Sequence, residues 1–199
     1  MISKRLFDVL ASLAGLMLLL PLLLAIAVTV GLDSPGGIFF RQIRVGRCGR
    51  TFSMFKFRSM RAVPDHNGPL ITRQGDPRIT RVGAFLRRTK LDELPQLINV
   101  VRGDMSLVGP RPEVPKYIEM YPPELRHIVL SVRPGMTDEA SIEFRNEEAL
   151  LACASDPEAK YVREVLPRKI DIYVRYVKNR NFLGDLSILL RTLYCTFYR

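Results

Sequence analysis

The sequence predicts an α+β fold: a mainly helical domain with a small β-hairpin, preceded by an N-terminal kinked helix that enters a membrane and returns. Three observations support this prediction. Residues 9–32 form an uncharged run of 24 residues, two strand-like runs flank a turn at residues 46–50, and apolar residues recur at helical spacing through much of the remaining chain. We therefore expect a membrane segment in residues 1–35 and a globular domain in residues 36–199.

The uncharged run is long enough to cross a bilayer as one helix, and three interpretations compete. A cleaved signal peptide would end near the small residues 25–27, but apolar residues continue beyond them. A single spanning helix should have one flank poor in Lys and Arg, whereas both flanks here are basic. The basic residues are Lys4 and Arg5 before the run, and Arg41, Arg44, Arg47 and Arg50 after it. A re-entrant hairpin satisfies this charge pattern, because it keeps both flanks on the cytoplasmic side.

Pro21 lies near the middle of the run and explains how such a hairpin turns. Proline has no backbone N–H, and its ring collides with the preceding turn of a helix, so it kinks or breaks the helix. We therefore expect a break at Leu20-Pro21, with both arms in one leaflet of the inner membrane. The globular domain then lies on the cytoplasmic face of that membrane.

The elements of the globular domain follow from local patterns. Breaker residues at 33–37 end the membrane segment, and residues 38–45 and 51–60 read as the two strands of a hairpin. Residues 63–76 are polar and rich in Gly and Pro, which predicts a surface loop. Helical spacing of apolar residues predicts helices at 79–90, 91–101, 113–130 with a break at Pro122-Pro123, 139–154, 158–178 and 183–198.

Composition narrows the classes of partner. The 199 residues carry a net charge of +10, which favours anionic partners such as phosphorylated molecules, an acidic membrane face or nucleic acid. The three cysteines are scattered and show neither a disulfide pattern nor metal spacing. The sequence contains no Walker A motif, no GxGxxG, and no Ser-His arrangement for nucleophilic catalysis.

Residues 90–112 carry the strongest indication of chemistry. The adjacent carboxylates Asp92 and Glu93 precede Pro95, which is tolerated only in the first turn of a helix, so the pair is expected at a helix start. Such a start presents free N–H groups and suits a phosphate. Asp92 can then be a nucleophile, a ligand of a divalent metal or an N-cap, and Glu93 a second metal ligand or a group that handles protons.

A basic anion site is predicted next to this pair. Arg111 lies between Pro110 and Pro112, so its backbone is rigid, and a fixed guanidinium can bind two phosphate oxygens at once. Lys56 and Arg58 on the second strand, and Arg133 in a Val-Arg-Pro-Gly turn, are further candidates for the same site.

Six motifs in this order resemble those of the bacterial sugar transferases, the small monotopic phosphoglycosyl transferases that start surface-glycan synthesis. The motifs are Phe40-Arg41-Gln42 with Val45-Gly46, Lys56-Phe57-Arg58-Ser59-Met60, Asp76-Pro77-Arg78-Ile79-Thr80-Arg81-Val82-Gly83, Leu91-Asp92-Glu93-Leu94-Pro95-Gln96, Gly103-Asp104-Met105-Ser106-Leu107-Val108-Gly109-Pro110-Arg111-Pro112 and Val132-Arg133-Pro134-Gly135. The resemblance runs from residue 1 to about residue 135 and continues more loosely to the C-terminus.

The resemblance implies an activity and roles for individual residues. It implies transfer of a C1-phosphosugar from a UDP-sugar to polyprenol (undecaprenyl) phosphate at the bilayer surface, with Mg²⁺ and release of UMP. Asp92 then forms a covalent phosphosugar–aspartyl intermediate, and Glu93 assists through the metal or through proton handling. After Gly135 the sequence departs from many relatives, which leaves the sugar open. Arg145 in this divergent stretch contacts the uridine or the sugar phosphate, or instead pairs with Glu148 on the surface.

Two other functions remain alternatives. One is a metal-dependent phosphohydrolase that acts on lipid phosphates. The other is a non-enzymatic basic membrane protein that binds nucleic acid or anionic lipid. The order of the six motifs favours the transferase over both, and with it an enzyme that has no nucleic-acid partner.

Overall fold

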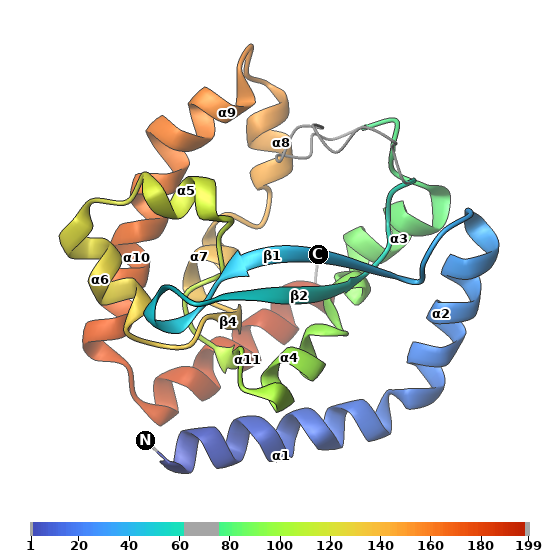
Figure 1. The fold of residues 1–199 in the computed structure, drawn as a ribbon, viewed down its shortest axis with the longest axis horizontal. Helices are drawn as coiled ribbons and strands as arrows, with labels where there is room; N and C mark the ends of the chain where they lie inside the picture. The colour runs from blue at the N-terminus through green and yellow to red at the C-terminus, as the bar shows by residue number, and fades with distance from the viewer. Residues whose placement is uncertain (1, 62–75, 198–199) are drawn as a thin grey trace.

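The computed structural model describes residues 2–61 and 76–197, so the predicted loop at 63–76 lies almost wholly outside the described residues (Figure 1). Four strands are β1 (Phe39–Val45), β2 (Thr51–Phe57), β3 (Ser106–Val108) and β4 (Gly135–Thr137) among the described residues. The helices in the same part of the chain are α1 (Ile2–Leu18), α2 (Leu20–Asp33), α3 (Arg81–Thr89), α4 (Gln96–Arg102), α5 (Pro115–Glu119), α6 (Pro123–Leu130), α7 (Glu139–Glu143), α8 (Glu147–Ala152), α9 (Pro157–Lys160), α10 (Leu166–Asn179) and α11 (Phe182–Phe197). The prediction of a mainly helical protein with a small antiparallel sheet is confirmed.

The N-terminal segment forms two helices that meet at a sharp bend. Helices α1 and α2 are inclined by 64° to each other, with the break at Leu19, directly before the expected Leu20-Pro21 step. Pro21 lies in the first turn of α2, where its missing N–H leaves no bond unmade. Within the described residues no single helix is long and apolar enough to cross a bilayer, whereas the bent pair taken together meets that requirement.

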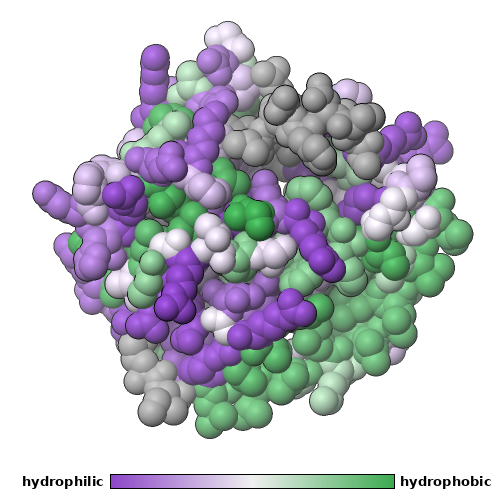
Figure 2. Space-filling view, in the orientation of Figure 1, coloured by the Kyte–Doolittle hydropathy of each residue, from purple (hydrophilic) through white to green (hydrophobic). Residues whose placement is uncertain are grey.

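The bent pair exposes many large apolar side chains. Figure 2 shows an apolar surface over the part of the molecule that α1 and α2 form in Figure 1. The exposed side chains are Leu6, Leu10, Leu13, Met17 and Leu18 on α1, and Leu20, Leu22, Leu24, Val28 and Leu32 on α2. A soluble protein rarely exposes so large a contiguous apolar surface, which indicates contact with a partner or with lipid.

The other face of α1 is fixed to the globular part by charged and polar groups. Lys4 Nζ lies 2.5 Å from Asp185 Oδ2 on α11, and Arg5 donates to carbonyl oxygens in the last turn of α4. The buried Asp8 carboxylate accepts a hydrogen bond of 2.7 Å from the Ser106 hydroxyl on β3. The first helix therefore contacts segments from the middle and from the end of the chain.

The hairpin of β1 and β2 lies across the middle of the molecule in Figure 1, and β2 contacts α4. Its strands pair antiparallel in a register that joins Phe39 to Phe57 and Val45 to Thr51. The connecting turn has positive φ at Cys48. Strand β1 is largely exposed, whereas the second half of β2 is buried against the helices, so β2 is the strand that can place side chains in the interior.

Several predicted helices are interrupted, and proline is a frequent cause. The helix expected at 91–101 begins only at α4, because Pro95 occupies its N-cap position and residues 91–93 form a separate 3₁₀ turn. The stretch at 113–130 divides into α5 and α6 around the expected break at Pro122-Pro123. The stretch at 158–178 is helical throughout, as expected, with a π-turn at Tyr161–Val165 that joins α9 to α10.

A second, parallel pair of strands was not expected from the sequence. Strands β3 and β4 pair over three residues each, and the turns that adjoin them come together. Gly135 N–H donates to the Pro110 carbonyl, and Gly109 N–H donates to the Thr137 carbonyl. A Cβ atom on Gly135 would lie 2.1 Å from the Gly109 nitrogen, so only glycine permits this approach.

We predict that Gly83→Ala strongly destabilises the fold. A Cβ at this position of α3 would lie 2.0 Å from the Ser59 carbonyl oxygen, and backbone atoms cannot move aside as a side chain can. We expect the melting temperature, followed by far-UV circular dichroism, to fall by about 5 °C or more. Gly31→Ala is the matched control, because no atom lies within 4 Å of its added Cβ. Equal melting temperatures for the two variants contradict the prediction.

Candidate active site

The carboxylate pair lies on the 3₁₀ turn Leu91–Glu93, between the end of α3 and the start of α4. Asp92 is 5% exposed and Glu93 is 9% exposed, so both acidic side chains are buried. Helix α3 ends because Lys90 adopts the left-handed conformation, with φ 58° and ψ 13°, and this turns the chain into the 3₁₀ turn. The backbone therefore presents both carboxylates at a sharp corner of the chain.

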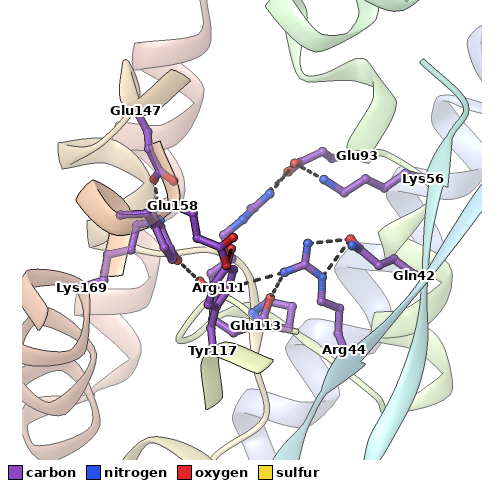
Figure 3. A network of polar contacts seen from close by, with 12 residues as sticks. Gln42, Arg44, Lys56, Glu93, Arg111, Glu113, Tyr117, Glu147, Glu158 and Lys169 are labelled. Atoms are coloured by element: carbon purple, nitrogen blue, oxygen red, sulfur yellow. Dashed lines mark hydrogen bonds and ion pairs between the residues drawn. The ribbon is translucent and has the colours of Figure 1, made fainter. Parts of the chain in front are cut away.

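Glu93 is bound by two cations from distant segments. Its Oε1 atom accepts from Lys56 Nζ on β2 at 2.8 Å and from Arg111 Nη2 at 2.5 Å, and its Oε2 atom accepts from Arg111 Nη1 at 3.3 Å. Figure 3 shows Lys56 and Arg111 approaching Glu93 from different elements. Both oxygens of Glu93 are therefore engaged.

Asp92 has a different environment. Its Oδ1 atom is buried and has no hydrogen-bond partner among the described residues. The interpretation of Asp92 as an N-cap is wrong, because the residue before α4 is Pro95 and no cap bond from a side chain is found there. A buried oxygen without a donor costs free energy, and such a cost is typical of a group kept for a ligand or a reaction.

The pKa values of the two carboxyl groups are shifted from their ordinary values in opposite directions. Burial, followed by the negative charge of Glu93, raises the pKa of Asp92 to about 6. Burial also acts to raise the pKa of Glu93, but the positive charges of Arg111 and then Lys56 hold it well below its usual range. Glu93 thus remains ionised, whereas Asp92 titrates near neutral pH. Adjacent carboxyl groups with separated pKa values are typical of sites where one of them reacts.

The turn that carries Arg111 is held in place by strand β1 and by Tyr161 of the π-turn before α10. Arg44 donates to the Pro112 carbonyl at 3.0 Å and lies 3.6 Å from a Glu113 carboxylate oxygen. The other carboxylate oxygen of Glu113 accepts from the Tyr161 hydroxyl at 2.7 Å. The Val45 N–H donates to the Glu113 carbonyl. The hairpin thus contacts both Glu93, through β2, and the Arg111 turn, through β1.

The other predicted anion-binding residues lie in different surroundings. The Arg58 guanidinium donates to the carbonyl oxygens of Val30, Ser34 and Pro35 at the end of α2. Arg133 Nε donates to the Gly103 carbonyl at 2.8 Å.

Arg145 is exposed after α7, and the side chain of Glu148, its suggested partner, lies outside the described residues. The structure therefore brings Lys56 and Arg111 to the carboxylate pair. No contact of Arg58, Arg133 or Arg145 with the pair is found in the described part of the chain.

Asn99 on α4 is a structural residue that the sequence did not reveal. It is fully buried, accepts a hydrogen bond from the Phe55 N–H and donates to the Ser53 carbonyl and to Asp104. These bonds join α4 to β2, the strand that carries Lys56. The only signal in the sequence is that Asn99 is the one polar residue in the otherwise apolar run of residues 97–101.

Mg²⁺ was expected at the carboxylate pair. The described residues contain no group of three or more His, Cys, Asp or Glu side chains that could hold a metal ion. Mg²⁺ needs fewer protein ligands than this, because it keeps several waters and binds substrate phosphates. Asp92 fits as such a ligand through its unpartnered oxygen, whereas both oxygens of Glu93 already accept bonds from Lys56 or Arg111.

The chain is similar to known proteins along its whole length. The model of the family described as "Bacterial sugar transferase" matches residues 1–199. The chain is 41% identical over 196 residues to a UDP-glucose:undecaprenyl-phosphate glucose-1-phosphate transferase of Xanthomonas campestris pv. campestris, covering 96% of this chain and 38% of the relative. It is 38% identical over 195 residues to a UDP-N-acetylgalactosamine-undecaprenyl-phosphate N-acetylgalactosaminephosphotransferase of Aeromonas hydrophila, covering 96% of this chain and 42% of the relative.

A third relative matches along nearly its whole length. It is an exopolysaccharide production protein of Rhizobium leguminosarum bv. phaseoli, 40% identical over 202 residues, with 97% of this chain and 94% of the relative covered. By contrast, the chain spans about two fifths of the length of the Xanthomonas and Aeromonas transferases.

We predict that the two carboxylates contribute to stability with opposite signs. The pKa of Asp92 is raised in the folded protein, so its ionisation costs stability near neutral pH, and this cost disappears below the pKa of an unfolded Asp. The pKa of Glu93 is lowered, so its ionisation stabilises the fold above the pKa of an unfolded Glu. Asp92→Asn should therefore stabilise the protein, and Glu93→Gln should destabilise it by leaving Lys56 and Arg111 without their anion.

Chemical unfolding near neutral pH checks this prediction. We expect a gain on the order of 2 kcal/mol for Asp92→Asn and a loss of about 3 kcal/mol for Glu93→Gln. The gain should vanish below pH ~4, where Asp92 is protonated in both states. Two losses of similar size would contradict the separation of the pKa values.

Proposed function

Because the chain belongs to the bacterial sugar transferase family, we propose that it transfers a C1-phosphosugar from a UDP-sugar to polyprenol phosphate and releases UMP. The names of the relatives from Xanthomonas and Aeromonas support this reaction, since both are undecaprenyl-phosphate sugar-phosphate transferases. The observation that carries the proposal is the buried Asp92 oxygen, which has no partner among the described residues and lies beside a fully engaged Glu93.

The transfer proceeds in two displacements at phosphorus. A carboxylate oxygen of Asp92 attacks the phosphorus that carries the sugar, and the bond from that phosphorus to the bridging oxygen breaks, so that UMP leaves with the electron pair. A phosphate oxygen of polyprenol phosphate then attacks the same phosphorus and expels the Asp92 carboxylate. The product is a polyprenyl diphosphosugar. A covalent carboxylate intermediate divides one difficult transfer into two easier steps.

Glu93 acts through the cations that it binds. Its lowered pKa makes it a poor proton donor, and its two oxygens already accept from Lys56 and Arg111. It therefore holds two positive groups beside Asp92, where negative charge develops on the phosphoryl oxygens during each displacement. Mg²⁺, with Asp92 as a protein ligand, supplies further neutralisation of the substrate diphosphate when it is bound.

The enzyme works from the cytoplasmic face of the inner membrane. The bent pair of α1 and α2 enters one leaflet as a re-entrant hairpin, which explains both the 64° bend and the exposed apolar side chains. Arg58 satisfies carbonyl groups at the end of α2, where the chain leaves the apolar segment. A lipid phosphate diffusing in that leaflet and a nucleotide sugar from the cytosol then meet at one site.

Turnover with a panel of UDP-sugars tests the proposed function. Protein in nanodiscs, given Mg²⁺ and polyprenol phosphate, should release UMP with one or a few sugars, and Asp92→Asn should release none. Wild-type turnover should fall at low pH, where Asp92 is protonated, because only ionised Asp92 attacks. Mass spectrometry of the wild type, given UDP-sugar alone, should find a phosphosugar on Asp92. Release of inorganic phosphate without UMP would instead indicate a phosphohydrolase, and no turnover would contradict both.

The re-entrant topology predicts that both ends of the hairpin are reached from the cytoplasm. In a background without Cys48, Cys153 and Cys195, single cysteines at Ser3 and Gly37 should react with a membrane-impermeant maleimide only in inverted vesicles. Labelling of one of these sites in intact spheroplasts would show a spanning helix.

A further inference from the structure

We propose that Lys90 binds a phosphate group of a substrate beside Asp92, a role that rests on the transfer reaction proposed above. Lys90 was not among the expected site residues. It immediately precedes the 3₁₀ turn that carries the carboxylate pair, and its carbonyl accepts the Glu93 N–H at 3.2 Å. The backbone of Lys90 is therefore part of the same turn as the two carboxylates.

The cations near the pair differ in how they are engaged. Lys56 and Arg111 are both bonded to Glu93. Lys90 is exposed, and its ammonium group makes no hydrogen bond, ion pair or ring contact within residues 2–61 and 76–197. Lys90 lies two residues before Asp92 and three before Glu93 in the sequence. Lys90 is thus close to the pair, and among the described residues no anion binds its ammonium group.

The backbone conformation of Lys90 argues against a purely structural role for its side chain. Lys90 is the left-handed residue that ends α3, and its N–H donates to the carbonyls of Leu86 and Arg87. Glycine is the usual residue at such a position, because a side chain is strained there. Favourable charge for the end of the helix is already supplied by Arg87 and Arg88 in the last turn. A lysine is therefore kept at a strained position where glycine would close the helix equally well.

The ligand is identified by its chemistry as a phosphate. A lysine ammonium is a compact charge with three donors, which suits a phosphate oxygen, and the reaction brings two phosphate-bearing substrates to Asp92. One is the diphosphate of the UDP-sugar, and the other is the phosphate of polyprenol phosphate. In a two-step reaction with a covalent intermediate, the kcat/KM of each substrate reports its own half-reaction, so kinetics can assign the contact to one of them.

Lys90→Gly is the variant that separates binding from folding. It removes the ammonium group and relieves the left-handed backbone, so the melting temperature should remain equal to that of the wild type or rise. We expect kcat/KM to fall about 10- to 100-fold for the UDP-sugar or for polyprenol phosphate, the size typical of a lost hydrogen bond to a charged group. Lys90→Arg should recover most of this loss. Arg88→Ala is the matched control, since it removes an equal charge from the same helix where Arg88 lies over the Phe85 ring.

The outcomes distinguish this role from the function on which it rests. A fall for the UDP-sugar places Lys90 on the diphosphate, and a fall for polyprenol phosphate places it on the lipid phosphate. Values of kcat/KM within twofold of the wild type for both substrates overturn the role of Lys90 alone. An equal fall in Arg88→Ala, or a fall in Lys90→Gly that comes with a lower melting temperature and is not recovered by Lys90→Arg, overturns it too. Absence of UMP from the wild-type protein overturns the proposed function, and this inference with it.

Discussion

The structure depends on one buried carboxylate, Glu93, and the two cations that it binds. Lys56 comes from β2, Glu93 from the turn after α3, and Arg111 from the turn after β3, so the interaction joins three segments that are distant in sequence. Removing Glu93 leaves two partly buried cations without their anion, and removing either cation leaves the buried Glu93 with one partner instead of two. Either loss is more costly than the loss of an exposed ion pair. The same arrangement leaves Asp92 beside a neutralised neighbour, so that a single carboxylate stays available for chemistry.

The sequence predicted those features that depend on local patterns. The hairpin and the helical character of the chain follow from periodicity, and the break near Pro21 follows from a missing N–H. The adjacent carboxylates and the rigid Arg111 turn predicted that charged groups of residues 90–112 share one site, and the structure brings Arg111 to Glu93. Features set by tertiary packing were not accessible in this way. The pairing of β3 with β4 depends on two glycines 26 positions apart, Gly109 and Gly135, whose backbones touch. The bonds of Asn99 to β2, and the commitment of Arg58 to α2, likewise require knowledge of which elements are neighbours.

The end of strand β2 links the bent pair of α1 and α2 to the carboxylate pair. Lys56 binds Glu93, and two residues later Arg58 binds the carbonyls at the end of α2. Gly36 makes this second contact feasible, because a Cβ atom there would lie 2.1 Å from an Arg58 nitrogen. Lys56 lies near the end of β2 and Arg58 directly after it, so one short piece of chain contacts both the end of α2 and the carboxylate pair. A shift of α2 relative to the globular part is therefore felt directly at Glu93.

The polar contacts that hold α1 against the globular part have a consequence for biosynthesis. Lys4, in the first turn of α1, has its partner only at Asp185, 181 residues later on α11. Asp8 and Ser106 likewise meet only after half of the chain has been made. Contacts between such distant residues form late, because the intervening chain must first be ordered. During translation, the apolar face of α1 and α2 is thus complete before the polar face of α1 has all the partners that it docks against.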